Sequence, residues 1–111
     1  MVVGVCRLTL MVPGSHSLKE KRMVLRRIKD RTRQKFNVAV AEVADQDAWQ
    51  QAVLGFAVVA NDKGFVNAML DKIVNFVEEL AVAKIVDDEK DVIQYGEDEG
   101  LGPEAHWEPE E

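Results

Sequence analysis

The sequence predicts an α+β domain in the order strand, helix, strand, strand, helix, strand. Three observations lead to this prediction: an alternating segment at the start of the chain, two amphipathic stretches of helical period behind capping residues, and apolar runs bounded by turn residues. With 111 residues, of which 47% are hydrophobic and 31% charged, the chain has the length and balance of one globular domain.

The first strand is predicted at Val2 to Val12, which ends at the turn residues Pro13-Gly14. Residues of one parity are apolar, namely Cys6, Leu8, Leu10 and Val12, whereas the other parity holds Arg7, Thr9 and Met11. Strict alternation of this kind predicts a strand with one buried face.

The first helix is predicted from a capping box, Ser17-Leu18-Lys19-Glu20, to about Lys35. An apolar stripe runs along it, formed by Leu18, Val24, Leu25 and Ile28 with Thr32 beside them. Lys21 falls among these positions. We therefore expect its stem to be buried and its ammonium group to reach solvent.

Two further strands are predicted at Phe36 to Val43 and at Ala52 to Ala60, joined by a polar connection that contains Trp49. Asp62 then provides a good N-cap for a second helix from about Lys63 to Leu80. Its apolar stripe, widened by four flanking residues, predicts a deeply packed helix: Val66, Leu70, Ile73 and Val77, with Phe65, Met69, Phe76 and Leu80.

A last strand is predicted from two β-like pieces, Ala83 to Val86 and Val92 to Tyr95, separated by a charged middle that is bulged or looped. Residues 1–95 form the predicted domain. Residues 96–111 hold seven acids and no Lys or Arg, which predicts an acidic disordered tail. Neither His106 nor Trp107 has an explanation in such a tail.

This order of elements matches the ferredoxin-like split βαβ arrangement, a four-stranded antiparallel sheet with two helices on one face. The other face of the sheet is then open, and it must be solvated, paired with another chain or used for binding. Small residues at Ala39, Ala41, Gly55 and Ala57 favour a face against which something packs closely.

Composition excludes several classes of function. The predicted domain holds one cysteine, Cys6, and one histidine, His16, so we expect no disulfide, no metal site and no catalytic residue. No glycine-rich phosphate loop is present, and neither a cofactor nor a small-molecule substrate is indicated. We read no signal peptide and no membrane span, which makes a cytoplasmic location the expectation.

The first helix carries the main candidate site. Between Ser17 and Lys35 there are nine Lys or Arg residues and two acids, although the whole chain has a net charge of −6. A basic ridge along this helix could neutralise the phosphates of a nucleic acid, and it comprises Lys19, Arg22, Arg26, Lys29 and Arg33. The alternative, which stays open, is a solvated helix face.

Two other interpretations concern the sheet. The segment Leu54 to Val59 partly matches the RNA-recognition-motif strand pattern, but Leu54 replaces its basic residue and Val58 replaces a stacking aromatic. The open face of the first strand is too apolar to leave wet, which predicts a homo-oligomer interface that includes Val3, Val5, Arg7 and Met11.

Four segments in fixed order resemble the YlxP-like family of small bacterial proteins: SLKEKR at Ser17–Arg22, FNVAVAEV at Phe36–Val43, Asp47-Ala48-Trp49, and LGFA at Leu54–Ala57. The resemblance covers about Met1 to Tyr95 and implies a ferredoxin-like fold. It also implies a link to translation, because genes of this family lie near those for ribosome-maturation factors. That link is one of association and assigns no residue a role.

Within SLKEKR, Ser17 and Glu20 have a capping role, whereas Lys19 and Arg22 have none and are better functional candidates. Trp49 is better explained as a lid over the sheet edge than as a platform for a base. We therefore expect a binding module for RNA or a ribosomal particle, with a protein-interaction or oligomeric scaffold as the alternative. A small-molecule sensor comes third, because no liganding residues stand out.

Overall fold

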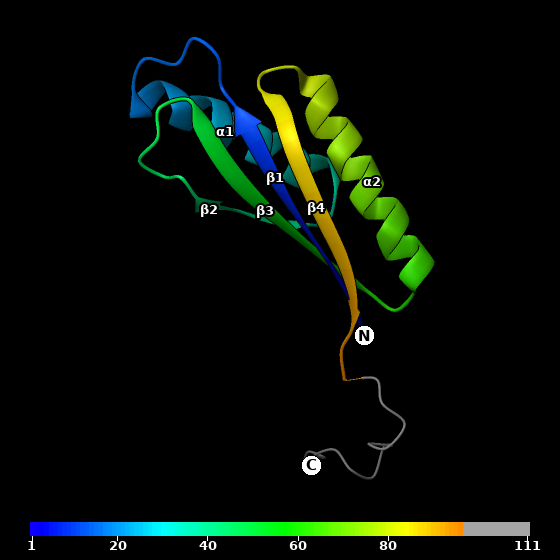
Figure 1. The fold of residues 1–111 in the computed structure, drawn as a ribbon. Helices are drawn as coiled ribbons and strands as arrows, with labels where there is room; N and C mark the ends of the chain where they lie inside the picture. Colours follow the sequence, from blue (N-terminus) through cyan, green and yellow to red (C-terminus); the bar gives the residue numbers. More distant parts are fainter. Residues whose placement is uncertain (97–111) are drawn as a thin grey trace, which may run out of the picture.

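The computed structural model describes residues 1–96 and has the predicted order of elements. These are β1 (Val2–Met11), α1 (Leu18–Lys35), β2 (Ala39–Ala44), β3 (Gln51–Ala60), α2 (Lys63–Leu80) and β4 (Lys84–Gln94). The strands form one antiparallel sheet in the order β2-β3-β1-β4, and both helices lie on the same face of it (Figure 1). The fold-class prediction is confirmed. The predicted tail, with His106 and Trp107, lies outside the described residues apart from Gly96.

The central strand β1 pairs with β3 on one side and with β4 on the other. Its helix-facing residues are buried as the alternation predicted, and they include Val2, Cys6, Leu8 and Leu10. A glycine, Gly4, lies between them. A Cβ atom at Gly4 would approach Val66 Cγ1 to 2.3 Å and Leu70 Cδ1 to 3.1 Å, so α2 packs directly onto the backbone of β1.

Helix α1 begins with the predicted capping box, except that Glu20 reaches back to the amide of His16 rather than to that of the N-cap residue Ser17. The Ser17 Oγ atom accepts a hydrogen bond from the Glu20 amide at 3.1 Å, and Glu20 Oε1 accepts one from the His16 amide at 2.5 Å. Leu25, Ile28 and Thr32 are buried against the sheet, whereas Leu18 and Val24 are half-buried. The apolar stripe is thus narrower than its sequence pattern suggests.

Lys21 is fully buried, so the expectation that its ammonium group reaches solvent is wrong. Its Nζ atom donates to the carbonyl oxygens of Asp45 at 2.8 Å, Gln51 at 3.2 Å and Gln46 at 3.4 Å. It also lies 3.3 Å from Glu42 Oε2, a buried oxygen with no hydrogen-bond partner among the described residues. Carbonyl groups of the β2–β3 connection and of the start of β3 therefore accept the hydrogen bonds that this ammonium group would otherwise donate to water.

Helix α2 begins at the predicted N-cap, where Asp62 Oδ2 accepts a hydrogen bond from the Phe65 amide at 2.7 Å. The predicted stripe of Val66, Leu70, Ile73 and Val77 is buried. Phe65 was expected to widen this stripe but is 54% exposed. Of the four flanking residues, it lies at the largest angle around the helix from the stripe. Phe76 is half-buried because the Phe36 ring packs edge-on against it, with 5.5 Å between centroids.

The edge strands β4 and β2 follow their predictions to different extents. β4 is one strand from Lys84 to Gln94, as predicted, and its bulge is a register shift opposite Thr9 and Leu10 that leaves Val86 unpaired, next to the charged middle. β2 begins at Ala39 rather than Phe36, because the Phe36 amide still donates to Thr32 O and closes α1. A second register shift lies between Glu42 and Ala44.

The Lys21→Met variant should lower the free energy of unfolding by roughly 2–4 kcal/mol, because Glu42 loses its ion-pair partner and three carbonyl oxygens lose their hydrogen-bond donor. Urea denaturation measures this change. The control Lys19→Met alters an exposed lysine on the same helix and should stay within about 0.5 kcal/mol of the wild type. Equal effects of the two substitutions would contradict the role assigned to Lys21.

The Gly4→Ala variant should lower the free energy of unfolding by about 1–3 kcal/mol, because the added methyl group overlaps Val66 in a packed core. Thermal denaturation followed by circular dichroism checks this. Gly64→Ala, in the exposed first turn of α2, is the matched control and should change the free energy of unfolding by less than about 0.5 kcal/mol, because its Cβ atom would meet only the exposed Asp62 carboxylate, at 3.3 Å. A neutral Gly4→Ala would mean that α2 does not pack onto β1 as described.

Candidate functional site

The predicted basic ridge forms one flank of α1. Four of its side chains are exposed and Lys29 is half-buried; the ridge comprises Lys19, Arg22, Arg26, Lys29 and Arg33. An Arg33 guanidinium nitrogen donates to the Val40 carbonyl oxygen at 2.8 Å. This flank therefore faces the outer side of β2, at the edge of the sheet.

Acids are nearly absent around this ridge. In the described part of the chain, its one ion pair joins Arg33 to Asp30, one helical turn away, at 3.8 Å. Lys19, Arg22, Arg26 and Lys29 have no carboxylate within ion-pair distance among residues 1–96. These four cations leave the flank with an unneutralised positive charge.

On the opposite flank of α1, the basic residue Lys35 contacts aromatic rings. Lys35 lies over the rings of Phe76 and Phe36, with its Nζ atom 5.5 Å and 5.9 Å from the two centroids. Cation–π contacts of this kind hold the ammonium group against the junction of the two helices. The basic ridge near β2 is therefore the flank with the more available charge.

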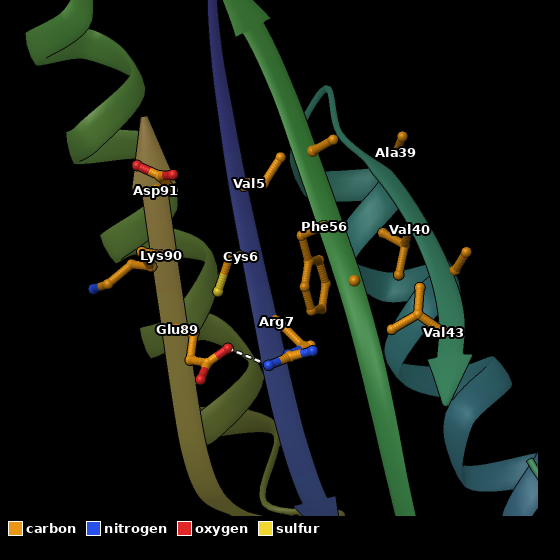
Figure 2. Close-up of a pocket in the computed structure, with 13 residues that line it drawn as sticks. Val5, Cys6, Arg7, Ala39, Val40, Val43, Phe56, Glu89, Lys90 and Asp91 are labelled. Atoms are coloured by element: carbon orange, nitrogen blue, oxygen red, sulfur yellow. Dashed lines mark hydrogen bonds and ion pairs between the residues drawn. The ribbon is translucent and has the colours of Figure 1, made fainter. Parts of the chain in front are cut away.

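The sheet face that the helices leave open contains a shallow hollow of about 840 Å³. Small residues of β2 and β3 form its floor. Cross-strand pairing places the lining residues in two rows across the sheet: Ala39, Ala57, Val5 and Asp91 in one, and Ala41, Gly55, Arg7 and Glu89 in the other. Figure 2 shows Val43 of β2 beside this floor and Arg7 of β1 reaching Glu89 of β4, with which it forms an ion pair.

The predicted interface residues all lie on this open face. Val5 is 37% exposed, Arg7 is exposed, and Val3 and Met11 are half-buried. Val43 and Val59 extend the apolar surface and are 54% and 59% exposed.

An acidic row borders the hollow on β4. Asp87, Glu89 and Asp91 lie opposite Thr9, Arg7 and Val5 of β1, and residues directly opposite in a sheet share a face. Sequence reasoning missed this row. The alternation of acids at every second position through the charged segment is the signal that could have found it.

The RNA-recognition-motif interpretation fails on geometry. Phe56, the aromatic residue of the matching segment, is 2% exposed and belongs to the core on the helix-covered face. Gly55 and Ala57 occupy the open face instead, and neither can stack on a base. The acidic row beside them would also repel phosphates.

Two other groups that line the hollow, Lys90 and Cys6, have pKa values shifted by their surroundings. Lys90 donates to Asp71 Oδ1 at 2.7 Å, and this hydrogen bond is the main cause that raises the pKa of Lys90, while burial acts in the opposite direction. Burial raises the pKa of the Cys6 thiol from 9.0 to about 11, and the Asp88 carboxylate adds to the rise. Residues 1–96 contain no cluster of three potential metal ligands and no helix long and apolar enough to cross a membrane.

Comparison with known proteins identifies the family. Residues 3–90 match a family described as "Protein of unknown function (DUF503)". This chain belongs to the DUF503 family. It is also 34% identical over 77 residues to the "Uncharacterized protein YlxP" of Bacillus subtilis (strain 168), a match that covers 69% of this chain and 84% of YlxP. The resemblance to the YlxP-like family is thereby confirmed.

A solved structure supports the fold. A de novo designed protein with a ferredoxin fold, determined by solution NMR, superimposes with a TM-score of 0.50. The match covers 100% of this chain and 95% of the designed protein at 14% identity. At that identity the similarity supports the ferredoxin fold alone.

The geometry sorts the residues of the SLKEKR segment in this DUF503 protein. Ser17 and Glu20 cap α1, and Lys21 holds the β2–β3 connection. Lys19 and Arg22 are exposed, and neither forms an ion pair within residues 1–96, which leaves them available for a partner. Trp49 is 56% exposed in the connection that Lys21 holds, and whether it acts as a lid stays a prediction.

The Cys6 thiol should resist alkylation in the folded protein, because it is buried and stays protonated until the pH approaches 11. Iodoacetamide labelling at pH 8, followed by mass spectrometry, should modify native protein at least about 100-fold more slowly than protein in 8 M urea. Equal rates in the two conditions would mean that Cys6 is accessible and reactive.

Proposed function

We propose that this protein is a non-catalytic cytoplasmic binding module that contacts RNA, within a ribosomal particle, through the basic ridge of α1. The observation that supports this proposal is the set of four unpaired cations, Lys19, Arg22, Arg26 and Lys29, on one flank of a rigid helix. Folding brings no carboxylate of residues 1–96 to them, whereas Lys21 on the same helix is fully neutralised.

The ridge suits contact with a phosphate backbone. From Lys19 to Arg33 it spans about 21 Å along the helix at 1.5 Å per residue, long enough to meet several successive phosphates. It carries no aromatic side chain with which to read bases. We therefore expect binding that depends strongly on salt and weakly on nucleotide sequence.

The ribosomal context rests on the family. The gene association that the YlxP-like resemblance implies favours a partner in translation, and ribosomal RNA offers the phosphate surface that the ridge would bind. A protein-interaction or oligomeric scaffold role remains the second candidate, and the apolar hollow of the open face favours it. In that role Val3, Val5, Arg7 and Met11 would contact the partner.

The test is binding of the full chain to purified ribosomal RNA and to ribosomal subunits over a salt series. We expect Lys19/Arg22/Arg26/Lys29→Gln to weaken binding at least about 30-fold at low salt. The slope of log K against log salt should fall by about 3, since each phosphate contact with single-stranded RNA contributes about 0.7. Arg33 is left intact because it also binds the Val40 carbonyl group.

The matched control is Arg27/Arg31/Lys63/Lys72→Gln, which removes the same charge from exposed positions outside the ridge. It should change the affinity less than threefold. If both variants lose affinity equally, the binding is a general charge effect and the ridge is not a site. If the wild-type protein binds neither RNA nor subunits at low salt, the ridge is a solvated helix face and the proposal is refuted.

A further inference from the structure

We propose that the open sheet face binds a basic, amphipathic helical segment of a partner protein, independently of RNA binding at α1. The proposed groove is the hollow over β2, β3, β1 and β4, with its apolar floor and its acidic border on β4. Its shape, its polarity and its charge each restrict the occupant.

The shape of the groove favours a thick, rounded element. Its floor is made of Ala39, Ala41, Gly55 and Ala57, so a partner can approach close to the sheet backbone. Val43 stands on one side of this floor, close enough that a Cβ atom on Gly55 would lie 3.0 Å from its Cγ1 atom. Four strands spaced about 4.8 Å apart make a face about 15 Å wide, which accommodates a helix about 10 Å in diameter.

Hydrogen bonding favours a helix over an extended segment. Of the strands under the groove, β3 and β1 have neighbours on both sides, so their backbone groups are already paired within the sheet, and the free edges of β2 and β4 lie beside the face rather than on it. A segment lying on the face cannot form a ladder with them, and its own backbone groups would be buried without partners. A helix satisfies those groups internally and presents only side chains to the apolar floor.

Charge complementarity identifies the polar side of this helix as basic. On β4, Glu89 pairs with Arg7, but Asp87 and Asp91 on either side of it have no cationic partner within residues 1–96. Lys84 shares this face only at the far end of the strand, beyond the register shift. A partner helix with aliphatic residues against the floor and Lys or Arg along one flank would neutralise both carboxylates.

The same charges argue against two other occupants. A second copy would bring its own Asp87 and Asp91 to the contact, while its Arg7 is already paired with Glu89. RNA would meet the acidic row with its phosphates and would find no aromatic side chain in the groove that is free to stack, since Phe56 is buried.

The experiment is selection of a phage-displayed library of random 16-residue peptides against the full-length protein. We expect enrichment of peptides with net positive charge and apolar residues at three- and four-residue spacing. Synthetic versions of the enriched peptides should lose at least tenfold in affinity for Ala57→Trp, which fills the groove. They should keep their affinity for Ala68→Trp, an equally bulky change on the exposed side of α2.

A charge-reversed variant tests the electrostatic step. Selection against Asp87→Lys/Asp91→Lys should no longer enrich basic peptides and should favour acidic ones. No enrichment over an empty support, enrichment that Ala57→Trp leaves unchanged, or a bias towards acidic peptides on the wild type would each overturn the proposal. A wild-type dimer in analytical ultracentrifugation that Ala57→Trp dissociates would also overturn it, because the groove would then hold a second copy.

Discussion

Both helices of this protein must bury their apolar stripes against one face of a single sheet. Each right-handed crossover places its helix on the same side, and Gly4 allows α2 to lie directly on the central strand. The core is therefore one layer between helices and sheet, with Leu8, Leu54, Leu70 and Ile73 fully buried in it. The open face, the basic flank beside β2 and the exposed edges of the sheet all follow from this arrangement.

Local patterns in the sequence predicted the elements that depend on local physics. The alternation in β1, the caps at Ser17 and Asp62 and the stripe of α2 each need only neighbours within one element, and all of them are confirmed. Features that depend on distant pairing were predicted only in outline. A bulge was expected within the charged middle of the last strand, whereas the ladder with β1 places it at Val86 and keeps Asp87 to Asp91 paired.

The candidate sites show the same division. The basic ridge was predictable because helical spacing fixes which residues share a flank. Lys21 was recognisable by its place among the apolar positions, but the carbonyl groups of the β2–β3 connection that keep its ammonium group inside could not be foreseen from the helix alone. The hollow of the open face needed the register of four strands, although its small residues were recognisable in the sequence.

Sheets with two free edges are prone to associate edge to edge, because an exposed edge strand can pair with a strand of another molecule. Here both edge strands carry the features that prevent this. β2 and β4 each contain a register shift that interrupts regular pairing, and the Val40 carbonyl group of β2 accepts a hydrogen bond from Arg33. Six of the eleven residues of β4 are charged. The protein can thus keep one face of its sheet accessible to partners without offering its edges as templates for aggregation.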